Sequence, residues 1–415
     1  MTQKKHKILL LSDHPLSTSG VGTQARWLIN GLINTGKYTF RCLGGAMKHS
    51  DYQTVVVNDD FIVKPVDGFG DRNLLRVLLA TEKPDALMLF TDPRFFIWVW
   101  EMEDEVHQIC PIVYNHLWDN PPWPDFNKVL YESTDLINCI NYPTYEMVHQ
   151  HFPEKTNFIP HALPSDVFKP LPKDQTKLLK RKLLGDSRSN HFIGLYVSRN
   201  ARRKMPSDLI QSWKMFLDDL EKKHGHKNAT LIMHTDPNDN EGPNLHHVVD
   251  LFGLKGNIFF SKDRIGFEEM TSLYNISDVV LSRSCNEGFG LSTLEGLYCG
   301  KPMISIKTGG LTRQVVNWET GFQHGVALDP EVRSLVGNQL VPYIYEDFVS
   351  HETYKNAIMK VYEMGPEGRE EVGNKGREYA LKEFSIERLV SEWDRTLQKT
   401  IHSQNESQKW KEVIL

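Results

Sequence analysis

Short apolar runs alternate with helix-like stretches along almost the whole chain, and this alternation constrains the fold more than any other feature. Such runs include Lys7–Leu11 and Ala86–Phe90 in the first half, and Phe192–Val197 and Pro302–Ile306 in the second. After Lys7–Leu11 a polar loop leads to Gln24–Leu32, whose apolar residues recur with the period of one helix face. Short buried strands that alternate with helices predict parallel sheets covered by helices on both faces.

The segment Phe168–Lys177 separates two series of such strands. It contains two prolines and shows no periodicity, so we interpret it as a linker. With 415 residues the chain is long enough for two or three domains of ordinary size. We therefore expect an α/β protein with one doubly wound domain at 1–172, a second at 173–385, and a C-terminal helix and tail at 386–415.

The composition favours a soluble intracellular protein. Its longest uninterrupted apolar stretch, Phe95–Trp100, is far shorter than the roughly 20 residues that span a bilayer, and the N-terminal apolar run is too short for a signal peptide. Five cysteines without a C-x-x-C pair fit neither a disulfide framework nor a zinc site. We expect a cytoplasmic protein whose net charge of −5 gives no general attraction to nucleic acid or anionic membranes.

The most informative spacing lies in the segment Asn286–Pro302. Glu287 and Glu295 are eight residues apart, so a continuous helix would place both on one face. Gly288 and Gly290 let the backbone approach a ligand where the helix begins, and a helix start suits a phosphate or a polyhydroxyl ligand. A glycine turn that caps a helix with two solvated acids explains the pattern equally well.

Two loops that follow predicted strands carry residues suited to phosphate. Ser198–Lys204 contains four cationic side chains at the carboxyl end of a strand, where ligands of open α/β sheets bind, and arginine and lysine suit a diphosphate. A solvated basic turn is the alternative. The loop Ser17–Gly22 is a short phosphate-type loop, although it lacks the full G-x-G-x-x-G spacing.

Two further features are ambiguous on their own. His116 follows the predicted strand Ile112–Tyr114, where a lone histidine is more often structural than catalytic. The aromatic stripe Phe95–Trp100, with Trp118 and Trp123 later, offers rings that stack on a sugar or a base, but core packing explains most of them better. No D-x-D triplet occurs, so the chain shows no carboxylate pair of the kind that holds a metal–nucleotide complex.

Taken in order along the chain, these motifs resemble those of the retaining glycosyltransferases of the GT-B fold, specifically glycosyltransferase family 4. The matches are the G-V-G loop Gly20–Gly22, His116, the segment Ile159–Pro170, the phosphate-binding pair Arg199 and Lys204, the E-x7-E pair Glu287 and Glu295, and the G-x-P triplet Gly300–Pro302. Each match alone is weak, but their common order makes a specific pattern.

The resemblance implies two Rossmann-like domains that face each other across a cleft, with the acceptor on the N-terminal domain and a nucleotide-sugar donor on the C-terminal domain. The C-terminal helix would return toward the N-terminal domain. Glu295 would bind the ribose, Arg199 and Lys204 the diphosphate, and Glu287 with the backbone of Phe289–Leu291 the sugar. The expected catalytic residues are Glu287, Arg199, Lys204 and His116, and the expected donor-binding residues are Gly20, Val21, Gly22, Gly288, Phe289, Gly290, Leu291 and Glu295. No metal and no other cofactor is expected, because fixed cations stabilise the departing nucleoside diphosphate.

Two departures from the family pattern bear on activity and acceptor. The usual G-G-x-x-E-x-V appears as Gly309–Val315, with Arg313 in place of the acid. Arg202–Ile210 and Val341–Phe348 are similar to a subgroup from tailed-phage genomes, for which a hydroxymethylated pyrimidine in phage DNA is a fitting acceptor. The alternatives are a saccharide or lipid-linked acceptor in glycan synthesis, and a nucleotide-sugar-binding protein without transfer activity.

Overall fold

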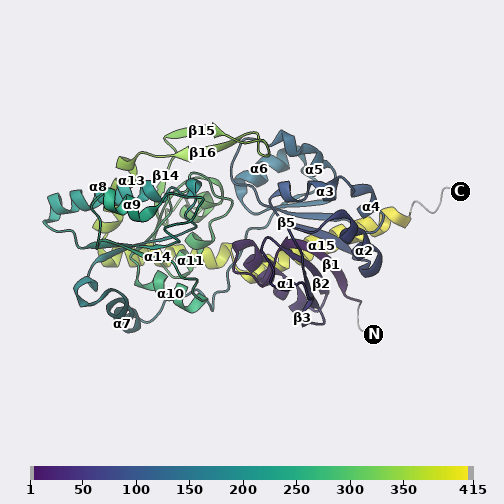
Figure 1. Cartoon of the computed structure of the whole chain (residues 1–415), viewed down its shortest axis with the longest axis horizontal. Coiled ribbons are helices and arrows are strands. Elements are labelled where there is room, and N and C mark those ends of the chain that lie inside the picture. Colours follow the sequence, from purple (N-terminus) through teal and green to yellow (C-terminus); the bar gives the residue numbers. More distant parts are fainter. Residues whose placement is uncertain (1–3, 410–415) are drawn as a thin grey trace. The chain divides into compact units, whose positions relative to one another are not determined.

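The chain divides by its internal contacts into two compact units (Figure 1). The computed structural model describes residues 4–409, with side chains through Gln404, so residues 410–415 of the predicted tail lie outside the described residues. Unit 1 comprises the chain up to Ala162, the segment Gly337–Ile344 and the chain from Ile386 onward. Unit 2 comprises Leu163–Val336 and Tyr345–Ser385.

Unit 1 is built on an eight-stranded sheet in the order β3-β4-β2-β1-β5-β6-β7-β8. Its strands are β1 (His6–Asp13), β2 (Tyr38–Gly45), β3 (Val55–Asn58), β4 (Phe61–Pro65), β5 (Ala86–Thr91), β6 (Ile112–His116), β7 (Leu136–Cys139) and β8 (Thr156–Phe158). All neighbouring strands are parallel except β3 and β4. Because β1 has a partner on both sides, its apolar run is buried on both faces: Ile8 and Leu10 enter one core cluster, and Leu9 and Leu11 enter the other.

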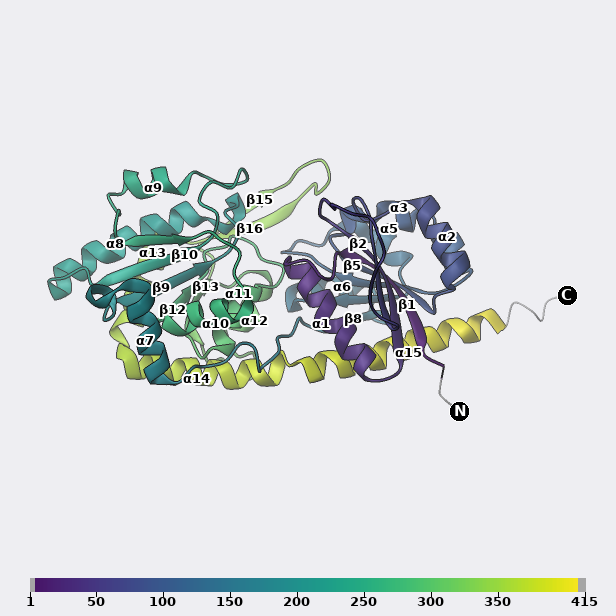
Figure 2. The same cartoon turned by 60° about the horizontal axis from the view of Figure 1, so that its bottom comes forward.

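Helices cover both faces of this sheet. The helices of unit 1 are α1 (Gly20–Asn34), α2 (Arg72–Glu82), α3 (Ile97–Trp100), α4 (Glu103–His107), α5 (Lys128–Glu132), α6 (Tyr142–His151) and α15 (Ile386–Lys409). In Figure 2, α15 (yellow) runs beside α1 (purple), and both belong to the core cluster of Ile8. Helix α15 buries Leu389, Trp393, Leu397 and Ile401, one residue per turn, which is the apolar stripe that the sequence predicts.

Unit 2 contains a second sheet, with six parallel strands in the order β11-β10-β9-β12-β13-β14. Its strands are β9 (Phe192–Val197), β10 (Ala229–His234), β11 (Ile258–Ser261), β12 (Val279–Leu281), β13 (Met303–Ile306) and β14 (Gly325–Leu328). This order runs outward in one direction from β9 and in the other from β12, as in Rossmann-like doubly wound sheets. A separate hairpin consists of β15 (Val332–Val336) and β16 (Ile344–Phe348).

The helices of unit 2 form two groups, one on each face of the sheet (Figure 2). In the first group α8 contacts both α9 and α13, and in the second α10 contacts α7 and α11, and α11 contacts α14. Their bounds are α7 (Lys173–Leu184), α8 (Pro206–His224), α9 (Leu245–Leu251), α10 (Phe267–Ile276), α11 (Leu291–Tyr298), α12 (Thr312–Val315), α13 (His351–Glu363) and α14 (Gly365–Glu383). Among residues 4–409, no helix combines the length and the apolar character that crossing a membrane requires.

The structure corrects the expected linker. Helix α7 begins at Lys173, directly after Pro172, so only the first half of Phe168–Lys177 lacks regular structure. The residues of α7 are mostly good helix formers, but none of them is buried. The apolar periodicity that reveals most helices is therefore weak in this segment.

Candidate active site

The carboxyl ends of β9 and β12 mark the point at which the chain changes direction across the sheet of unit 2. From β9 the chain continues to β10 and β11 on one side, and from β12 it continues to β13 and β14 on the other. The loops after these two strands therefore part, and ligands of open α/β sheets bind in the crevice that such loops form. The basic segment Ser198–Lys204 follows β9, and the loop of residues 282–290 follows β12, so both predicted motifs meet at this switch point.

An ion pair between Lys204 and Glu287 joins the two loops. The Lys204 ammonium contacts Oε2 of Glu287, and Ser284 Oγ donates to the same oxygen at 3.4 Å. Arg203 Nη1 lies 3.9 Å from Oε1 of Glu287 and donates a hydrogen bond of 3.1 Å to the carbonyl of Asn286. Because Lys204 is only 7% exposed, the pair is largely shielded from water.

The surroundings of Glu287 keep it ionised. Burial by itself would raise the pKa of Glu287, but the charges of Lys204 and Arg203, with hydrogen bonds from Lys204 and Ser284, outweigh burial and lower the pKa. Removal of either partner would leave an uncompensated charge in a shielded position. The switch point thus offers a fixed cation and a fixed carboxylate side by side, which suits a phosphate next to a sugar hydroxyl.

Helix α11 begins at Leu291, just after the two glycines at which the sequence predicts a helix start, so no continuous helix carries both Glu287 and Glu295. Gly290 has a φ of +92°, a left-handed conformation that ends the loop, and a Cβ there would lie 2.4 Å from Cδ2 of Leu311. Glu287 therefore precedes the helix and Glu295 lies on it. No side chain of the described residues caps α11, so the N–H groups of its first turn remain available to a ligand.

Gln314 fixes the approach to α11, and no sequence motif indicated it. Its side-chain oxygen accepts a hydrogen bond from Thr293 Oγ1 at 2.6 Å, and its side-chain nitrogen donates to the carbonyl of Phe289 at 2.7 Å. Phe289 is buried, and Gly288 and Gly290 flank it in the loop. The backbone expected to hold a sugar is therefore anchored from the side by a buried amide.

Arg313 occupies the position of the family's missing acid. Its guanidinium lies over the ring of Trp318, 4.8 Å from the ring centroid, and its backbone carbonyl accepts a hydrogen bond from Tyr379. The neighbouring Gln314, rather than the residue at the acid's position, makes the polar contacts to the loop before α11.

Glu295 has a partner that the sequence motif did not include. Tyr274 of α10 donates a hydrogen bond of 2.6 Å from its hydroxyl to Oε2 of Glu295. Burial raises the pKa of Glu295 to about 7, although the bond from Tyr274 acts in the opposite direction. The spacing of eight residues identified Glu295. Its partner Tyr274 is 21 positions away in the sequence, so only the fold shows that the two are in contact.

Arg199 lies outside the Lys204–Glu287 contacts. Its Nε donates to Oδ2 of Asp239 at 2.7 Å, and its Nη1 lies 3.0 Å from Oε2 of Glu241, both in the loop between β10 and α9. The hydrogen bond to Asp239 raises the pKa of Arg199, and its side chain is 59% exposed. A diphosphate that uses Arg199 must therefore replace these two carboxylates.

The glycine loop of unit 1 forms the first turn of α1. Ser19 caps this helix: its Oγ accepts from the backbone N–H of Gly22 at 3.0 Å and donates to Oδ2 of Asp13 at 2.7 Å. Gly20 begins the helix, Val21 packs against the core cluster of α1 and α15, and the space around Gly22 has no room for a Cβ. Val21 and Gly22 therefore have a packing role, whatever ligand the loop binds.

His116 ends β6 in unit 1 and is fully buried among aromatic rings. Its Nε2 lies 2.7 Å from the hydroxyl of Tyr131, and the rings of Tyr114 and Trp118 are also in contact distance. Burial lowers the pKa of His116 to about 3, so the imidazole is neutral at physiological pH. Among the residues that the structure describes, no cluster of histidine, cysteine or acidic side chains could hold a metal ion.

Comparison with known proteins finds a family model that matches much of the second unit. Residues 185–379 match the family described as "Glycosyl transferases group 1". A D-inositol 3-phosphate glycosyltransferase of Stackebrandtia nassauensis is 29% identical over 200 residues, which cover 47% of this chain and 43% of that protein. The chain thus matches less than half the length of this curated relative.

Two solved structures are similar over almost the whole chain. Sucrose-phosphate synthase from Thermosynechococcus elongatus aligns with a TM-score of 0.71 at 16% identity and covers 96% of this chain and 100% of that one. HepE of Anabaena, in complex with UDP and glucose, aligns with a TM-score of 0.69 at 17% identity and covers 95% of this chain and 100% of that one. The predicted fold class is confirmed: the chain has the GT-B fold with two Rossmann-like doubly wound domains.

Proposed function

We propose that this protein is a glycosyltransferase that moves a sugar from a nucleotide-sugar donor to a hydroxyl group of an acceptor. The observation that carries the proposal is the shielded Lys204–Glu287 pair at the switch point of unit 2, inside the segment that matches the glycosyl transferases group 1 family. The pair places a cation and a carboxylate where a nucleoside diphosphate and its sugar need them.

Lys204 stabilises the leaving group in this proposal. As the bond between the sugar's anomeric carbon and the diphosphate oxygen breaks, negative charge grows on the diphosphate, and a fixed ammonium stabilises that charge without reorganisation. Arg203, 3.9 Å from Glu287, adds a second cation at the same place. The acceptor oxygen forms the new bond to the anomeric carbon, and its proton leaves with the nucleoside diphosphate.

Glu287 and the start of α11 hold the sugar. The Glu287 carboxylate accepts hydrogen bonds from sugar hydroxyls, and the N–H groups that follow Gly290 donate to the sugar or phosphate oxygens. Glu295 accepts from the ribose. Arg199 binds the diphosphate after it leaves Asp239 and Glu241. We also propose that His116 is catalytic and that the following residues bind the donor: Gly20, Val21, Gly22, Gly288, Phe289 and Leu291.

We assign residues 173–385 to the donor and residues 1–172 to the acceptor, and we place the protein in family 4 with retention of the anomeric configuration. The resemblance of the E-x7-E pair and of the Arg199–Lys204 pair supports this assignment. The UDP and glucose in the complex of HepE, a protein of the same fold, support a nucleotide-sugar donor. Determination of the anomeric configuration of the product by NMR tests the stereochemistry.

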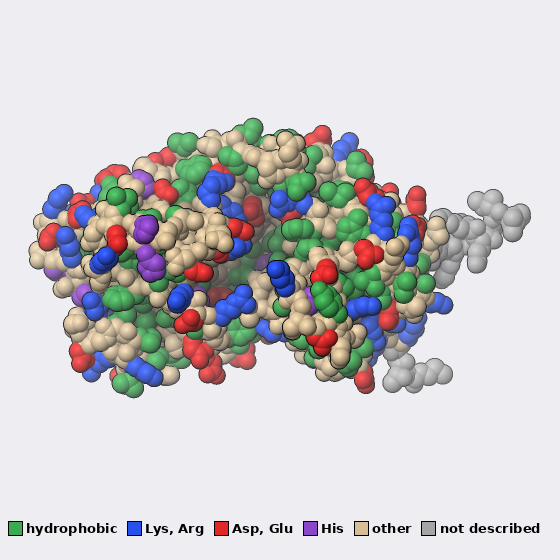
Figure 3. All heavy atoms as spheres, in the orientation of Figure 1, with side chains coloured by type: hydrophobic (Ala, Val, Ile, Leu, Met, Phe, Trp, Pro, Cys, Tyr) green, Lys and Arg blue, Asp and Glu red, His purple; other side chains and the backbone are tan. Residues whose placement is uncertain are grey.

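The acceptor is a hydroxyl compound, for which the sequence predicts a hydroxymethylated pyrimidine in phage DNA. A small hydroxylated acceptor is the second candidate, and three observations favour it. The curated relative is named for D-inositol 3-phosphate. Trp100 and Trp118 are buried in the core of unit 1 and do not offer their rings to a base. On the face drawn in Figure 3, basic and acidic side chains are intermingled, whereas DNA-binding surfaces gather basic ones.

The experiment measures the release of nucleoside diphosphate from a panel of UDP-, GDP- and ADP-sugars, after a thermal-shift screen for the sugars that bind. Release that requires an added acceptor supports the proposal. Tight binding without release under any condition would instead identify a nucleotide-sugar-binding protein. The donor that binds is then offered two acceptors in parallel reactions: a DNA duplex that contains hydroxymethylcytosine, and D-inositol 3-phosphate. The acceptor that receives the sugar identifies the acceptor class.

A further inference from the structure

Glu295 and Tyr274 lie on adjacent helices of unit 2 and are joined by one hydrogen bond. The Tyr274 hydroxyl donates to Oε2 of Glu295 at 2.6 Å, and Tyr274 is fully buried. In the part of the chain that the structure describes, no other hydrogen bond or ion pair reaches the Glu295 carboxylate. Its second oxygen, Oε1, therefore keeps its capacity to accept hydrogen bonds from a ligand.

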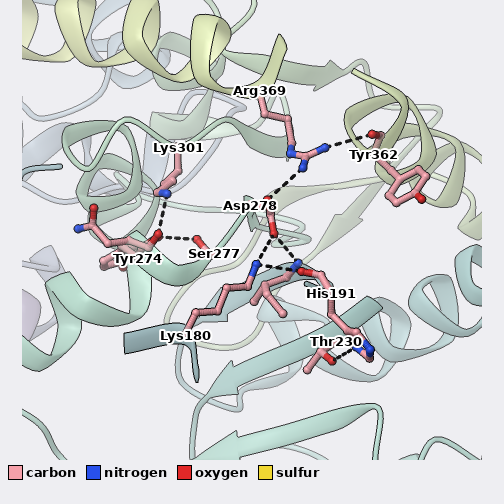
Figure 4. Close-up of polar contacts among 11 residues, drawn as sticks. Lys180, His191, Thr230, Tyr274, Ser277, Asp278, Lys301, Tyr362 and Arg369 are labelled. Atoms are coloured by element: carbon pink, nitrogen blue, oxygen red, sulfur yellow. Dashed lines mark hydrogen bonds and ion pairs between the residues drawn. The ribbon is translucent and has the colours of Figure 1, made fainter. Parts of the chain in front are cut away.

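Tyr274 is itself held firmly. Its ring meets the ring of Phe168 in an edge-on contact with the centroids 6.3 Å apart. Its backbone carbonyl accepts a hydrogen bond of 2.7 Å from Ser277 Oγ, and Lys301 Nζ donates to the next carbonyl, that of Asn275, at 2.8 Å (Figure 4). The end of α10 is thus fixed by contacts on both sides of the tyrosine.

The same end of α10 is also tied to the segment that leads into unit 2. The Asn275 side chain donates to the carbonyl of Lys169 at 2.9 Å and accepts from the N–H of Leu171 at 2.8 Å. Thr271 Oγ1 donates to the carbonyl of Val167 at 3.1 Å. A tyrosine on so well-anchored a helix can hold a carboxylate in one orientation, because its ring is fully buried and the backbone beneath it is hydrogen-bonded.

We infer that Tyr274 is a positioning residue for the donor's ribose: it occupies one oxygen of Glu295 and so directs the other oxygen to the ribose hydroxyls. The inference rests on the proposed function, in which Glu295 accepts from the ribose. A partly buried acceptor fixed in this way discriminates against a ligand that lacks the hydroxyl, because the acceptor is then left without its partner. Tyr274 therefore contributes to the preference for ribose over deoxyribose, although it does not touch the donor.

The surroundings of Glu295 give this inference a pH signature. The titratable groups that interact with it are Tyr274 on α10 and Cys299, directly after α11; Lys301 and Arg377 on α14 act in turn on Cys299. Of these groups only Tyr274 is bonded to the carboxylate; Lys301 and Arg377 donate to backbone carbonyls. Burial raises the pKa of Glu295 to about 7 and the bond from Tyr274 opposes that rise, so loss of the hydroxyl moves the pKa further upward.

The test compares the affinities of UDP, GDP and ADP with those of their 2′-deoxy counterparts by calorimetry, from pH 6 to pH 9. For the nucleotide that binds best, the ratio of deoxy to ribo dissociation constants reports the ribose contact, and it cancels the titration of the diphosphate. In the wild type we expect this ratio to be well above one at high pH and to fall as the pH drops through about 7. In Tyr274→Phe we expect the ratio to fall about tenfold at pH 8, with its midpoint at higher pH and the affinity for the deoxy nucleotide unchanged.

The matched control is Tyr298→Phe on α11, which removes a buried hydroxyl that donates to the Phe384 carbonyl and does not contact Glu295. It should keep the wild-type ratio. In a Glu295→Gln background, Tyr274→Phe should have no further effect on the ratio, because the two residues act as one unit.

Four results would overturn the inference. These are an unchanged ratio in Tyr274→Phe, an equal loss of affinity for both nucleotides, the same change in Tyr298→Phe, and a wild-type ratio that does not vary with pH. The last result is measured on the wild type, so the inference can be tested even if a variant fails to fold. If none of the nucleotides binds the wild type, the proposed function fails instead.

Discussion

Both units carry a switch point at which the loops after two adjacent parallel strands part: β1 and β5 in unit 1, β9 and β12 in unit 2. Each switch point places a carboxylate on one of these loops or at the end of its strand, Asp13 in unit 1 and Glu287 in unit 2. Asp13 accepts a hydrogen bond from Ser19, and burial raises its pKa. Glu287 contacts Lys204, and its pKa is lowered even though burial opposes that change.

The two carboxylates occupy equivalent places in their sheets but differ in their charged partners. No cation pairs with Asp13 among the residues that the structure describes. Unit 1 thus offers hydroxyls and a carboxyl group whose pKa burial raises, which suits a neutral hydroxyl compound, whereas unit 2 offers a cation beside an anion, which suits a charged nucleotide sugar. Five experiments test this contrast, in order of expected effect.

Lys204→Ala should lower turnover by about 100-fold or more, because it removes the cation that we propose stabilises the departing diphosphate. The measurement is the release of nucleoside diphosphate at saturating donor, with a check by circular dichroism that the variant is folded. Lys177→Ala on the exposed face of α7 is the matched control and should be nearly silent. Wild-type turnover in folded Lys204→Ala would refute the assignment of the donor site.

Glu287→Gln should lower the free energy of unfolding at pH 7 by about 3 kcal/mol, because it leaves Lys204 without its counter-charge in a shielded position. The folded-state pKa of Glu287 is lowered, so its stabilisation is present above the unfolded pKa and is lost as the pH falls. Denaturant titrations at pH 7 and pH 4 should therefore show a smaller difference between variant and wild type at pH 4. An equal difference at both values would argue against an ionised Glu287.

Asp239→Asn should strengthen the binding of a nucleoside diphosphate several-fold, because it releases Arg199 from its main carboxylate partner. The measurement is calorimetric titration with UDP, GDP and ADP at low salt. Asp186→Asn, which lies on the exposed turn after α7, serves as the control for a change in net charge. Weaker binding in Asp239→Asn would mean that this carboxylate holds Arg199 in its working position.

Asp13→Asn should change the free energy of unfolding by no more than about 1 kcal/mol. The dependence of this change on pH should be opposite to that of Glu287→Gln. The folded-state pKa of Asp13 is raised, so its favourable contribution is present at low pH and is lost as the pH rises through that value. Relative to wild type, the variant should therefore gain stability between pH 4 and pH 7. A loss over that range, like that of Glu287→Gln, would erase the contrast between the two switch points.

Excess chelator should leave turnover unchanged within about twofold, because Lys204 and the neighbouring arginines supply the positive charge that a metal ion would bring. The assay is transfer with and without EDTA, followed by addition of magnesium or manganese. Loss of activity in EDTA, restored by either metal, would show that the protein cations are insufficient.

The sequence by itself determined the local elements and the chemical character of the site. The short apolar runs predicted strands such as β9 and β5. A strand of a parallel sheet is buried on both faces, so it appears in the sequence as a continuous apolar run. The spacing of Glu287 and Glu295 and the cations of Ser198–Lys204 pointed to a phosphate and sugar site, because these properties lie within one stretch of chain. The apolar stripe of α15 was predicted from the sequence because it, too, lies within one stretch of chain.

Only the tertiary structure decided which of these residues meet. Lys204 and Glu287 are 83 positions apart, and they are in contact because β9 and β12 are neighbours in the sheet. The same strand order and helix packing pair Tyr274 with Glu295 and give Arg199 to Asp239. Periodicity records which face of an element is buried, but not which element lies against it, so partners, pKa shifts and the burial of His116 follow from the fold alone.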